Sequence, residues 1–199
     1  MRPWILSGLA CVALFGGAVR GRIIQASTVT TAPAPTPLIL EKDEGELRER
    51  RPREASMASN QFFIKVDRKN GGSQQMFMGA EDIPPGGLIP KHKHLGQDEI
   101  LIIQSGSAHA WLDTQERDVH AGAVIFIPSD TWVSLKNTGS ETIRLAFVFS
   151  APGYDEFMRC TSVPAGDSVV NRVSKEEFVE CEHKGHVQYG DNPGSPAPR

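Results

Sequence analysis

Two histidines and a glutamate near the middle of the chain have the side chains of a metal site. His92 and His94 are separated by one residue, and Glu99 follows five positions after His94. Alternate side chains of an extended chain share one face, so both imidazoles point the same way. Two neutral imidazoles and one carboxylate suit divalent iron and its first-row neighbours. The spacing therefore predicts a metal site made of His92, His94 and Glu99.

The residues between these ligands predict a tight turn. Leu95, Gly96 and Gln97 follow His94 directly, and glycine takes a positive φ without steric cost. The next strand then opens at Glu99, which can return beside the histidines. By strand parity Asp98 points away from Glu99, so it is not included among the ligands. Gln97 lies on the turn, where it could hydrogen-bond a metal-bound water or a substrate.

The stretch from Gly86 to Gly106 resembles the first motif of the cupin superfamily, G(X)5HXH(X)4E(X)6G. Every fixed position of that motif is filled, by Gly86, His92, His94, Glu99 and Gly106. The resemblance covers the region from Gln61 to Ser150. It implies a small, single-domain protein of the type-2 kind, with one conserved barrel.

The second motif of the family, G(X)5PXG(X)2H(X)3N, is only partly present. Gly122, Pro128 and Asn137 fit its spacing, and Asp130, which tolerates a left-handed turn, replaces the inner glycine. Val133 stands where the family has a histidine that serves as the fourth ligand. The resemblance therefore implies a site for one divalent ion (Fe, Mn, Ni or Zn) with three protein ligands. Such a site leaves open positions, as a catalytic metal needs.

The strand pattern around the motifs predicts the fold class. The chain has 199 residues, which fits one domain with tails. From Gln61 onwards, short apolar runs alternate with turn residues, and no helical period lies between them. This pattern is typical of an all-β sandwich or barrel, and the resemblance narrows it to a single jelly-roll, the double-stranded β-helix. We place the barrel at residues 60–152, between an N-terminal extension and a tail that carries a short helix.

Two of the expected strands are apolar at every position. Residues 100–103 read Ile-Leu-Ile-Ile, and residues 124–127 read Val-Ile-Phe-Ile. A half-exposed strand alternates, so both faces of these strands are expected to be covered. A small barrel covers only its inside. The outer cover would come from a second subunit, which predicts a homodimer, or from the N-terminal arm.

The first 26 residues read as a secretory signal peptide, with cleavage between residues 18 and 26. One early positive charge precedes an uncharged apolar stretch, and small residues follow it. The stretch is shorter than the ~20 residues that a membrane-spanning helix needs, although an uncleaved membrane anchor is the alternative. The expected location is secreted or periplasmic, with no membrane attachment after cleavage. The formal net charge of −3 provides no basic field for phosphate backbones, so no nucleic-acid partner is expected.

Residues 27–59 are expected to be a linker followed by a charged arm. The segment from Thr28 to Pro37 is rich in Pro, Thr and Ala, and the segment from Glu41 to Glu54 is dense in charges of both signs. We favour a solvated approach segment. The alternative is an arm that lies on the barrel of a partner subunit, with its arginines paired to carboxylates.

The tail, residues 153–190, carries one helix signal. Ser174 reads as an N-cap with Glu177 reaching back to it, and Gly185 suits the end of the helix. Residues 191–199 are rich in Pro, Gly and Ser and are expected to be disordered.

The two cysteines outside the signal segment admit two interpretations. In an exported protein, Cys160 and Cys181 predict one disulfide. The alternative is a metal site on Cys181, His183 and His186, spaced C-x-H-x-x-H, which could also supply the ligand that Val133 cannot.

These features predict an exported metal-binding protein whose ligand is a small molecule. The first hypothesis is a metal-dependent enzyme, with an oxygen-using oxidoreductase of the dioxygenase kind favoured by the ligand set. Gln97, Val133 and Phe147 are the candidates for its substrate pocket, and no catalytic residue beyond the metal ligands is identified. The alternative, favoured by Val133, is a non-catalytic module that binds a small molecule or a carbohydrate. A structural or storage role is less favoured, because three of the four ligand positions are kept.

Overall fold

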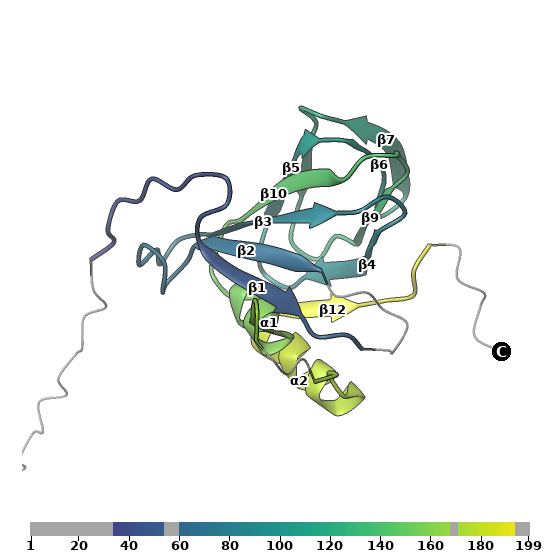
Figure 1. The fold of residues 1–199 in the computed structure, drawn as a ribbon. Helices are drawn as coiled ribbons and strands as arrows, with labels where there is room; N and C mark the ends of the chain where they lie inside the picture. The colour runs from purple at the N-terminus through teal and green to yellow at the C-terminus, as the bar shows by residue number, and fades with distance from the viewer. Residues whose placement is uncertain (1–33, 54–59, 168–170, 194–199) are drawn as a thin grey trace, which may run out of the picture. The chain divides into compact units, whose positions relative to one another are not determined.

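The chain forms twelve strands and two helices in the residues that this computed structural model describes, 34–53, 60–167 and 171–193 (Figure 1). The strands are β1 (Glu46–Arg50), β2 (Gln61–Val66), β3 (Phe77–Ile83), β4 (Leu88–His94), β5 (Glu99–Ser105), β6 (Ser107–Leu112), β7 (Gln115–His120), β8 (Val124–Ile127), β9 (Val133–Asn137), β10 (Ile143–Phe149), β11 (Ser162–Pro164) and β12 (Val187–Tyr189). The helices are α1 (Tyr154–Cys160) and α2 (Lys175–Gly185).

Two antiparallel sheets enclose the core (Figure 1). One has seven strands in the order β11-β1-β2-β3-β10-β5-β8, and the other has five in the order β12-β4-β9-β6-β7. Several neighbours are distant in sequence, since β10 pairs with both β3 and β5, and β4 pairs with β9. Strands that alternate between two sheets in this way make a jelly-roll. The structure confirms the predicted all-β jelly-roll.

The inward faces of the strands build the core, with the period of two that strands impose. In β5 the side chains of Glu99, Leu101 and Ile103 are buried, whereas Ile100 faces out. Large apolar side chains from both sheets fill the space, among them Phe62, Phe77, Leu135, Leu145 and Phe149. The predicted ligand Glu99 therefore begins a strand whose next inward residues, Leu101 and Ile103, are packed in the core.

The outer faces of β5 and β8 are open in the single chain, so the arm does not supply the expected outer cover. Val124 and Phe126 are 63% and 55% exposed. The strand β8 is the edge of its sheet, whereas the arm of the same chain pairs with β2 towards the other edge. A cover by the arm of the same chain is therefore wrong for these strands. A second subunit stays a prediction.

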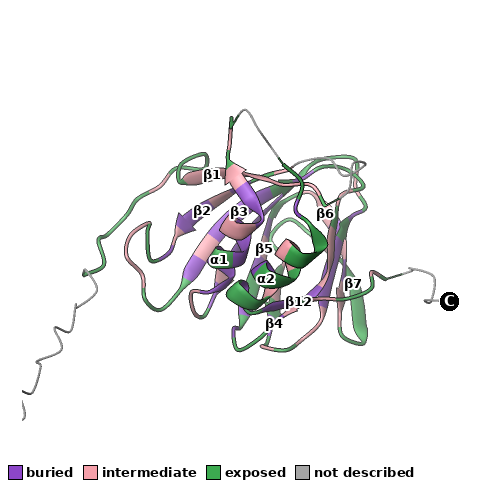
Figure 2. Ribbon diagram, turned by 90° about the horizontal axis from the view of Figure 1, so that it is seen from below, coloured by how far each residue is buried: buried purple, intermediate pink, exposed green. Residues whose placement is uncertain are grey.

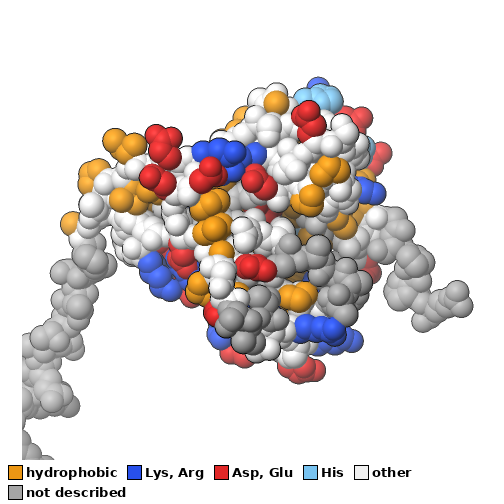
Figure 3. All heavy atoms as spheres, viewed as in Figure 1, with side chains coloured by type: hydrophobic (Ala, Val, Ile, Leu, Met, Phe, Trp, Pro, Cys, Tyr) orange, Lys and Arg blue, Asp and Glu red, His pale blue; other side chains and the backbone are white. Residues whose placement is uncertain are grey.

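The charged arm is a strand of the sheet, so the favoured solvated segment is a wrong prediction. The strand β1 pairs with β2 on one side and β11 on the other. Arg50 binds Glu81 at 2.8 Å, and Arg51 binds Glu177 at 2.5 Å. Within β1, Glu46, Arg48 and Arg50 have partners of opposite sign in the same chain, which lets these charged residues join the sheet. On the face shown in Figure 3, basic and acidic side chains are accordingly interspersed rather than gathered in one broad patch.

The tail contains two helices packed against each other, where one was predicted (Figure 2). The helix α1 follows Gly153 and has no side-chain cap, so no sequence signal marked its start. The Ser174 hydroxyl caps α2 by accepting from the amide of Glu177, as predicted. The Glu177 carboxylate binds Arg51 and also interacts with the backbone amide of Ser174, as the capping box predicts.

The contact between α1 and α2 includes a disulfide and a close approach. Cys160 of α1 is bonded to Cys181 of α2. A Cβ atom at Gly185 would lie 2.2 Å from Cβ of Phe157, so glycine is required where α2 crosses α1. The left-handed residue that ends α2 is His186, with φ of 52°, rather than Gly185. The tail is thereby fixed as one unit against the barrel.

Some predictions fall outside the described residues. These are the signal peptide or anchor at residues 1–26, most of the linker, and residues 194–199 of the predicted disordered end. Neither α1 nor α2, the helices of the described part, is long and apolar enough to cross a membrane.

Candidate metal centre

His92, His94 and Glu99 meet inside the barrel. Both histidines lie on β4, and Glu99 opens β5 after the turn at Gly96, whose φ is 78°. Each of the three offers one ligand atom, and these atoms lie within 4.8 Å of one another. Nε2 of His94 is 3.3 Å from Oε2 of Glu99. All three side chains are buried. The residues that the sequence spacing singled out therefore converge as a set of candidate ligands.

Contacts with neighbouring groups hold the two imidazoles in orientation. Nδ1 of His92 lies 2.8 Å from the carbonyl oxygen of Pro90. Because a carbonyl only accepts, this contact requires the hydrogen on Nδ1 and leaves the Nε2 lone pair for a metal. The His94 ring stands edge-on to the rings of Phe149 and Tyr154, at 4.7 and 4.5 Å between centroids. Both imidazoles are thus positioned before any ion binds.

Burial sets the charge of these groups in the metal-free protein. Burial lowers the pKa of His94 to about 3. Burial and, secondly, His94 lower the pKa of His92 to about 4, although Glu99 opposes the shift. Burial raises the pKa of Glu99 to about 7, a rise that His92 opposes and Glu81 increases. Near neutral pH both imidazoles therefore have free lone pairs, and a cation among them would stabilise the carboxylate.

Unsatisfied buried atoms mark the same place. Within the described part of the chain, both ring nitrogens of His94, Oε2 of Glu99 and Oε1 of Gln97 have no hydrogen-bond partner. Buried polar atoms without partners cost free energy and are rare in native proteins. A divalent ion would satisfy one His94 nitrogen and the Glu99 oxygen at once. The residues present therefore fit a metal ion that prefers nitrogen and oxygen ligands.

The three residues predicted for the substrate pocket are buried near the ligands. Val133 lies opposite His92 in the ladder between β4 and β9, so both side chains face the interior. Gln97 donates from Nε2 to the Pro152 carbonyl at 3.1 Å, which attaches the ligand turn to the start of the tail. Phe147 is 4% exposed. None of the three lines either of the two cavities described below.

The alternative ligands in the tail do not join the site. Cys181 is bonded to Cys160, and the side chains of His183 and His186 are exposed. Neither histidine belongs to the converging group found among the described residues. The metal site proposed for the C-x-H-x-x-H spacing is therefore wrong. Asp98 points away from the ligands, as expected, and accepts from the amide of Ser129 at 2.9 Å.

Two tyrosines of the tail lie against the histidines, and neither was predicted from the sequence. The Tyr154 ring is 4.5 Å from that of His94, and the Tyr189 ring stacks on that of His92 at 5.4 Å. Their hydroxyl oxygens are 3.4 Å apart. Tyr189 arrives because β12 adds itself to the edge of β4. That pairing joins segments about a hundred residues apart, so no local pattern predicts it.

Glu81 is a buried carboxylate that the sequence reasoning missed. It is 7% exposed on β3 and pairs with Arg50 of the arm at 2.8 Å. Alternation along β3 places it on the inward face with Phe77 and Ile83. That alternation was readable in the sequence and could have identified Glu81. The barrel therefore holds a second acidic group close enough to raise the pKa of Glu99.

A cavity of about 540 Å³ lies between the arm, the barrel and the tail. Tyr154 and Tyr189 line it, whereas His92, His94 and Glu99 do not. The two phenol rings therefore form the wall between this cavity and the ligands. The other lining residues include Arg50, Arg51, Arg53, Glu81, Phe157 and Phe178.

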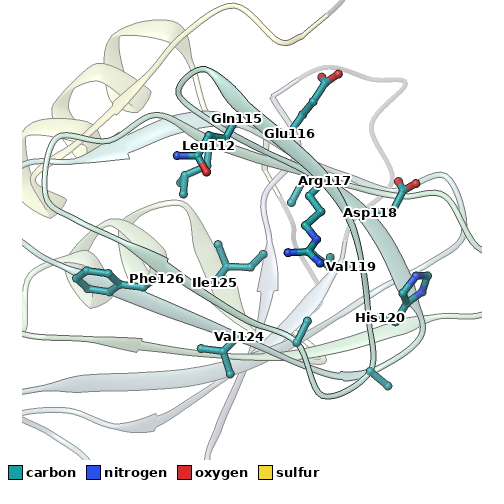
Figure 4. Close-up of a pocket in the computed structure, with 13 residues that line it drawn as sticks. Leu112, Gln115, Glu116, Arg117, Asp118, Val119, His120, Val124, Ile125 and Phe126 are labelled. Atoms are coloured by element: carbon teal, nitrogen blue, oxygen red, sulfur yellow. The ribbon is translucent and has the colours of Figure 1, made fainter.

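A second hollow, of about 550 Å³, opens between the edge strands β7 and β8 (Figure 4). Charged side chains of β7, such as Arg117, line one side of it, and Val124 and Phe126 of β8 line the other. It contains none of the metal ligands. It belongs to the exposed edge described above.

Comparisons with known proteins match the barrel. Residues 79–149 match the family described as "Cupin domain". Protein SchB of Streptomyces halstedii is 30% identical over 76 residues, which are 38% of this chain and 55% of that protein. The match thus spans little more than half the length of that relative. A predicted oxalate decarboxylase from Thermotoga maritima has a TM-score of 0.50 and 21% identity, covering 58% of this chain and 100% of that one. Arg50, Tyr154 and Tyr189 lie outside residues 79–149.

Proposed function

The chain is a member of the cupin superfamily, and on this premise we propose that it is an exported, metal-dependent enzyme acting on a small organic molecule. One observation carries the proposal: three buried ligand atoms converge within 4.8 Å, and His94 and Glu99 keep polar atoms without partners. Two imidazoles and one carboxylate are the ligands of oxygen-using non-haem iron. An oxidoreductase of the dioxygenase kind is therefore the favoured class.

The residues of the chain have distinct roles in this proposal. When bound, the metal supplies open coordination positions for a substrate oxygen or for dioxygen. The Pro90 carbonyl orients His92, and the rings of Phe149 and Tyr154 orient His94. Val133 stands where the family has its fourth ligand, and its apolar side chain cannot coordinate a metal, so that coordination position is left without a protein ligand. Arg50 donates to Oε2 of Glu81 at 2.8 Å and so holds this second buried carboxylate in place.

The alternative is a non-catalytic module that binds a small molecule or a carbohydrate. Val133 and the position of the 540 Å³ cavity favour it, because the ligands do not line that cavity. The likeness to the Thermotoga protein does not decide between the two, since 21% identity shows the fold alone. Turnover that depends on the metal would favour the enzyme, and ligand binding that ignores the metal would favour the module.

Metal analysis of the purified protein tests the proposal. The protein, prepared without an affinity tag or chelator, is expected to carry about one first-row divalent ion per chain. The variant with His92→Ala and His94→Ala is expected to lose it. His109→Ala is the matched control, because His109 is on the outer face of β6 against Asp118. If the folded double variant keeps the metal content of the parent, the proposed site is wrong. The mass of the mature protein, which shows where its N-terminus lies, tests export.

A further inference from the structure

The cavity beside the tyrosines has a wall of aromatic rings. Tyr154, Phe157, Phe178 and Tyr189 line it. The Tyr154 and Phe157 rings are stacked at 5.3 Å, and the Phe178 and Tyr189 rings meet edge to face at 5.2 Å. A volume of about 540 Å³ lies in the range of small-molecule sites. The wall therefore offers apolar surface to a planar ligand ring of about the size of the rings in the wall.

The charge around this cavity is positive, and only some of its arginines are paired with carboxylates. Three arginines and one glutamate line it. Arg50 binds Glu81, and Arg51 binds Glu177. Arg53, in contrast, has no carboxylate partner among the described residues. Its guanidinium lies over the rings of Phe178 and Tyr189, at 4.6 and 5.5 Å from their centroids.

Stacking leaves the donors of Arg53 available. The N–H groups of a guanidinium lie in its own plane, where they match the two oxygens of a carboxylate. The side chain of Arg53 is exposed, so a ligand can reach it. The aromatic wall and a carboxylate-binding edge therefore meet at the same point of the cavity.

The tyrosine hydroxyls supply a polar group at another point of the wall. They lie 3.4 Å apart, and either can be the donor in this contact. At most one of the two hydroxyl hydrogens lies between the oxygens. The other can donate to an oxygen of a ligand.

We propose that this cavity binds an aromatic carboxylate, with the ring beside the aromatic wall and the carboxylate on Arg53. An oxygen substituent on the ring would accept from Tyr154 or Tyr189. The site goes beyond the proposed enzyme function, because none of its residues is a metal ligand. Its aromatic wall and Arg53 come from the arm and tail, outside residues 79–149. These additions adapt a common barrel to one class of ligand.

Titration calorimetry on the metal-free protein tests this site with benzoate, benzamide and acetate as probes. Benzoate is expected to bind once per chain. Benzamide, which has the ring without the charge, and acetate, which has the charge without the ring, are each expected to bind at least about tenfold more weakly. Arg53→Gln is expected to weaken benzoate binding about tenfold and to remove its advantage over benzamide. Arg117→Gln, an exposed arginine of β7 outside this cavity, is the matched control and is expected to change nothing.

Several results would overturn the site. They are the absence of benzoate binding to the parent, equal binding of acetate and benzoate, and unchanged benzoate binding in Arg53→Gln. Benzoate binding that appears only after Mn²⁺ is added would place the carboxylate on the metal, which overturns this site and leaves the proposed function standing. Benzoate binding to a protein that takes up no metal would support this site and remove the proposed function.

Discussion

Replacing Glu99 by glutamine should stabilise the metal-free protein at alkaline pH while destroying its metal site. Glu99 is 5% exposed, and burial raises its pKa to about 7 from an ordinary 4.5, with His92 opposing the rise. A group whose pKa is raised by folding binds its proton more tightly in the folded protein. Its contribution to stability is complete below about pH 4.5 and is lost as the pH rises through about 7.

The size of this loss follows from the pKa of Glu99. The difference between about 7 and 4.5, at roughly 1.4 kcal/mol per pKa unit, corresponds to about 3 kcal/mol. Glutamine keeps the shape of the side chain and is uncharged at every pH, so it avoids the loss. We expect Glu99→Gln to exceed the unfolding free energy of the parent by up to about 3 kcal/mol at pH 8.5, and by less than about 1 kcal/mol at pH 5.

The histidines titrate in the opposite sense but cancel in this comparison. The lowered pKa values of His92 and His94, about 4 and about 3, mean that their contribution is present above about 6.5 and is lost as the pH falls towards those values. Both proteins contain them, and removing the Glu99 charge only lowers the pKa of His92 further, so both histidines stay largely neutral in the folded protein above pH 5. The difference between parent and variant therefore reports on Glu99.

Urea unfolding in the presence of EDTA, at several pH values between 5 and 8.5, measures this difference. Glu141→Gln is the control, because Glu141 is exposed, and its unfolding free energy should follow that of the parent. Added Mn²⁺ should then stabilise the parent and the control but not Glu99→Gln. A variant no more stable than the parent at pH 8.5 would refute the reasoning. It would show that the buried charge of Glu99 does not destabilise the metal-free protein.

Three further predictions follow from the tail, the fourth ligand position and the exposed edge. Loss of the Cys160–Cys181 bond, which closes a loop of 21 residues, is expected to lower the unfolding free energy by about 3 kcal/mol; two reactive thiols per mature chain in the unreduced, denatured protein would contradict the bond. Val133→His is expected to tighten metal binding in competition with a chelator. If the parent has no measurable affinity for metal and only the variant binds it, the binding module would be favoured instead. We propose that a second copy covers β5 and β8, so Val124→Glu with Phe126→Glu should convert a homodimer into monomers in light scattering. A monomeric parent would count against the dimer.

The metal ligands and the barrel strands were predictable because their signals are local. His92, His94 and Glu99 lie on two consecutive strands, β4 and β5, joined by a short turn, where strand period and one glycine decide which way each side chain points. Apolar runs and turn residues likewise predicted an all-β sandwich or barrel, which the resemblance to cupins narrowed to the jelly-roll. The capped start of α2 at Ser174 was visible for the same reason.

The arm and the wall of the cavity depended on contacts between distant segments. The strand β1 is charged, and only its partners elsewhere in the chain, such as Glu81, make it a strand. The helix α1 begins after a glycine without a side-chain cap. Tyr189 reaches His92 only because β12 pairs with β4. Local propensity could not predict these features, because tertiary pairing decides them.

The most direct test of the metal site is a crystal of the full chain grown with Mn²⁺ and measured for anomalous scattering. We expect one strong peak bounded by Nε2 of His92, a ring nitrogen of His94 and the Glu99 carboxylate, at distances of about 2.0–2.3 Å. A peak at His183 and His186 instead, or an empty barrel in a crystal grown at millimolar Mn²⁺, would contradict the account.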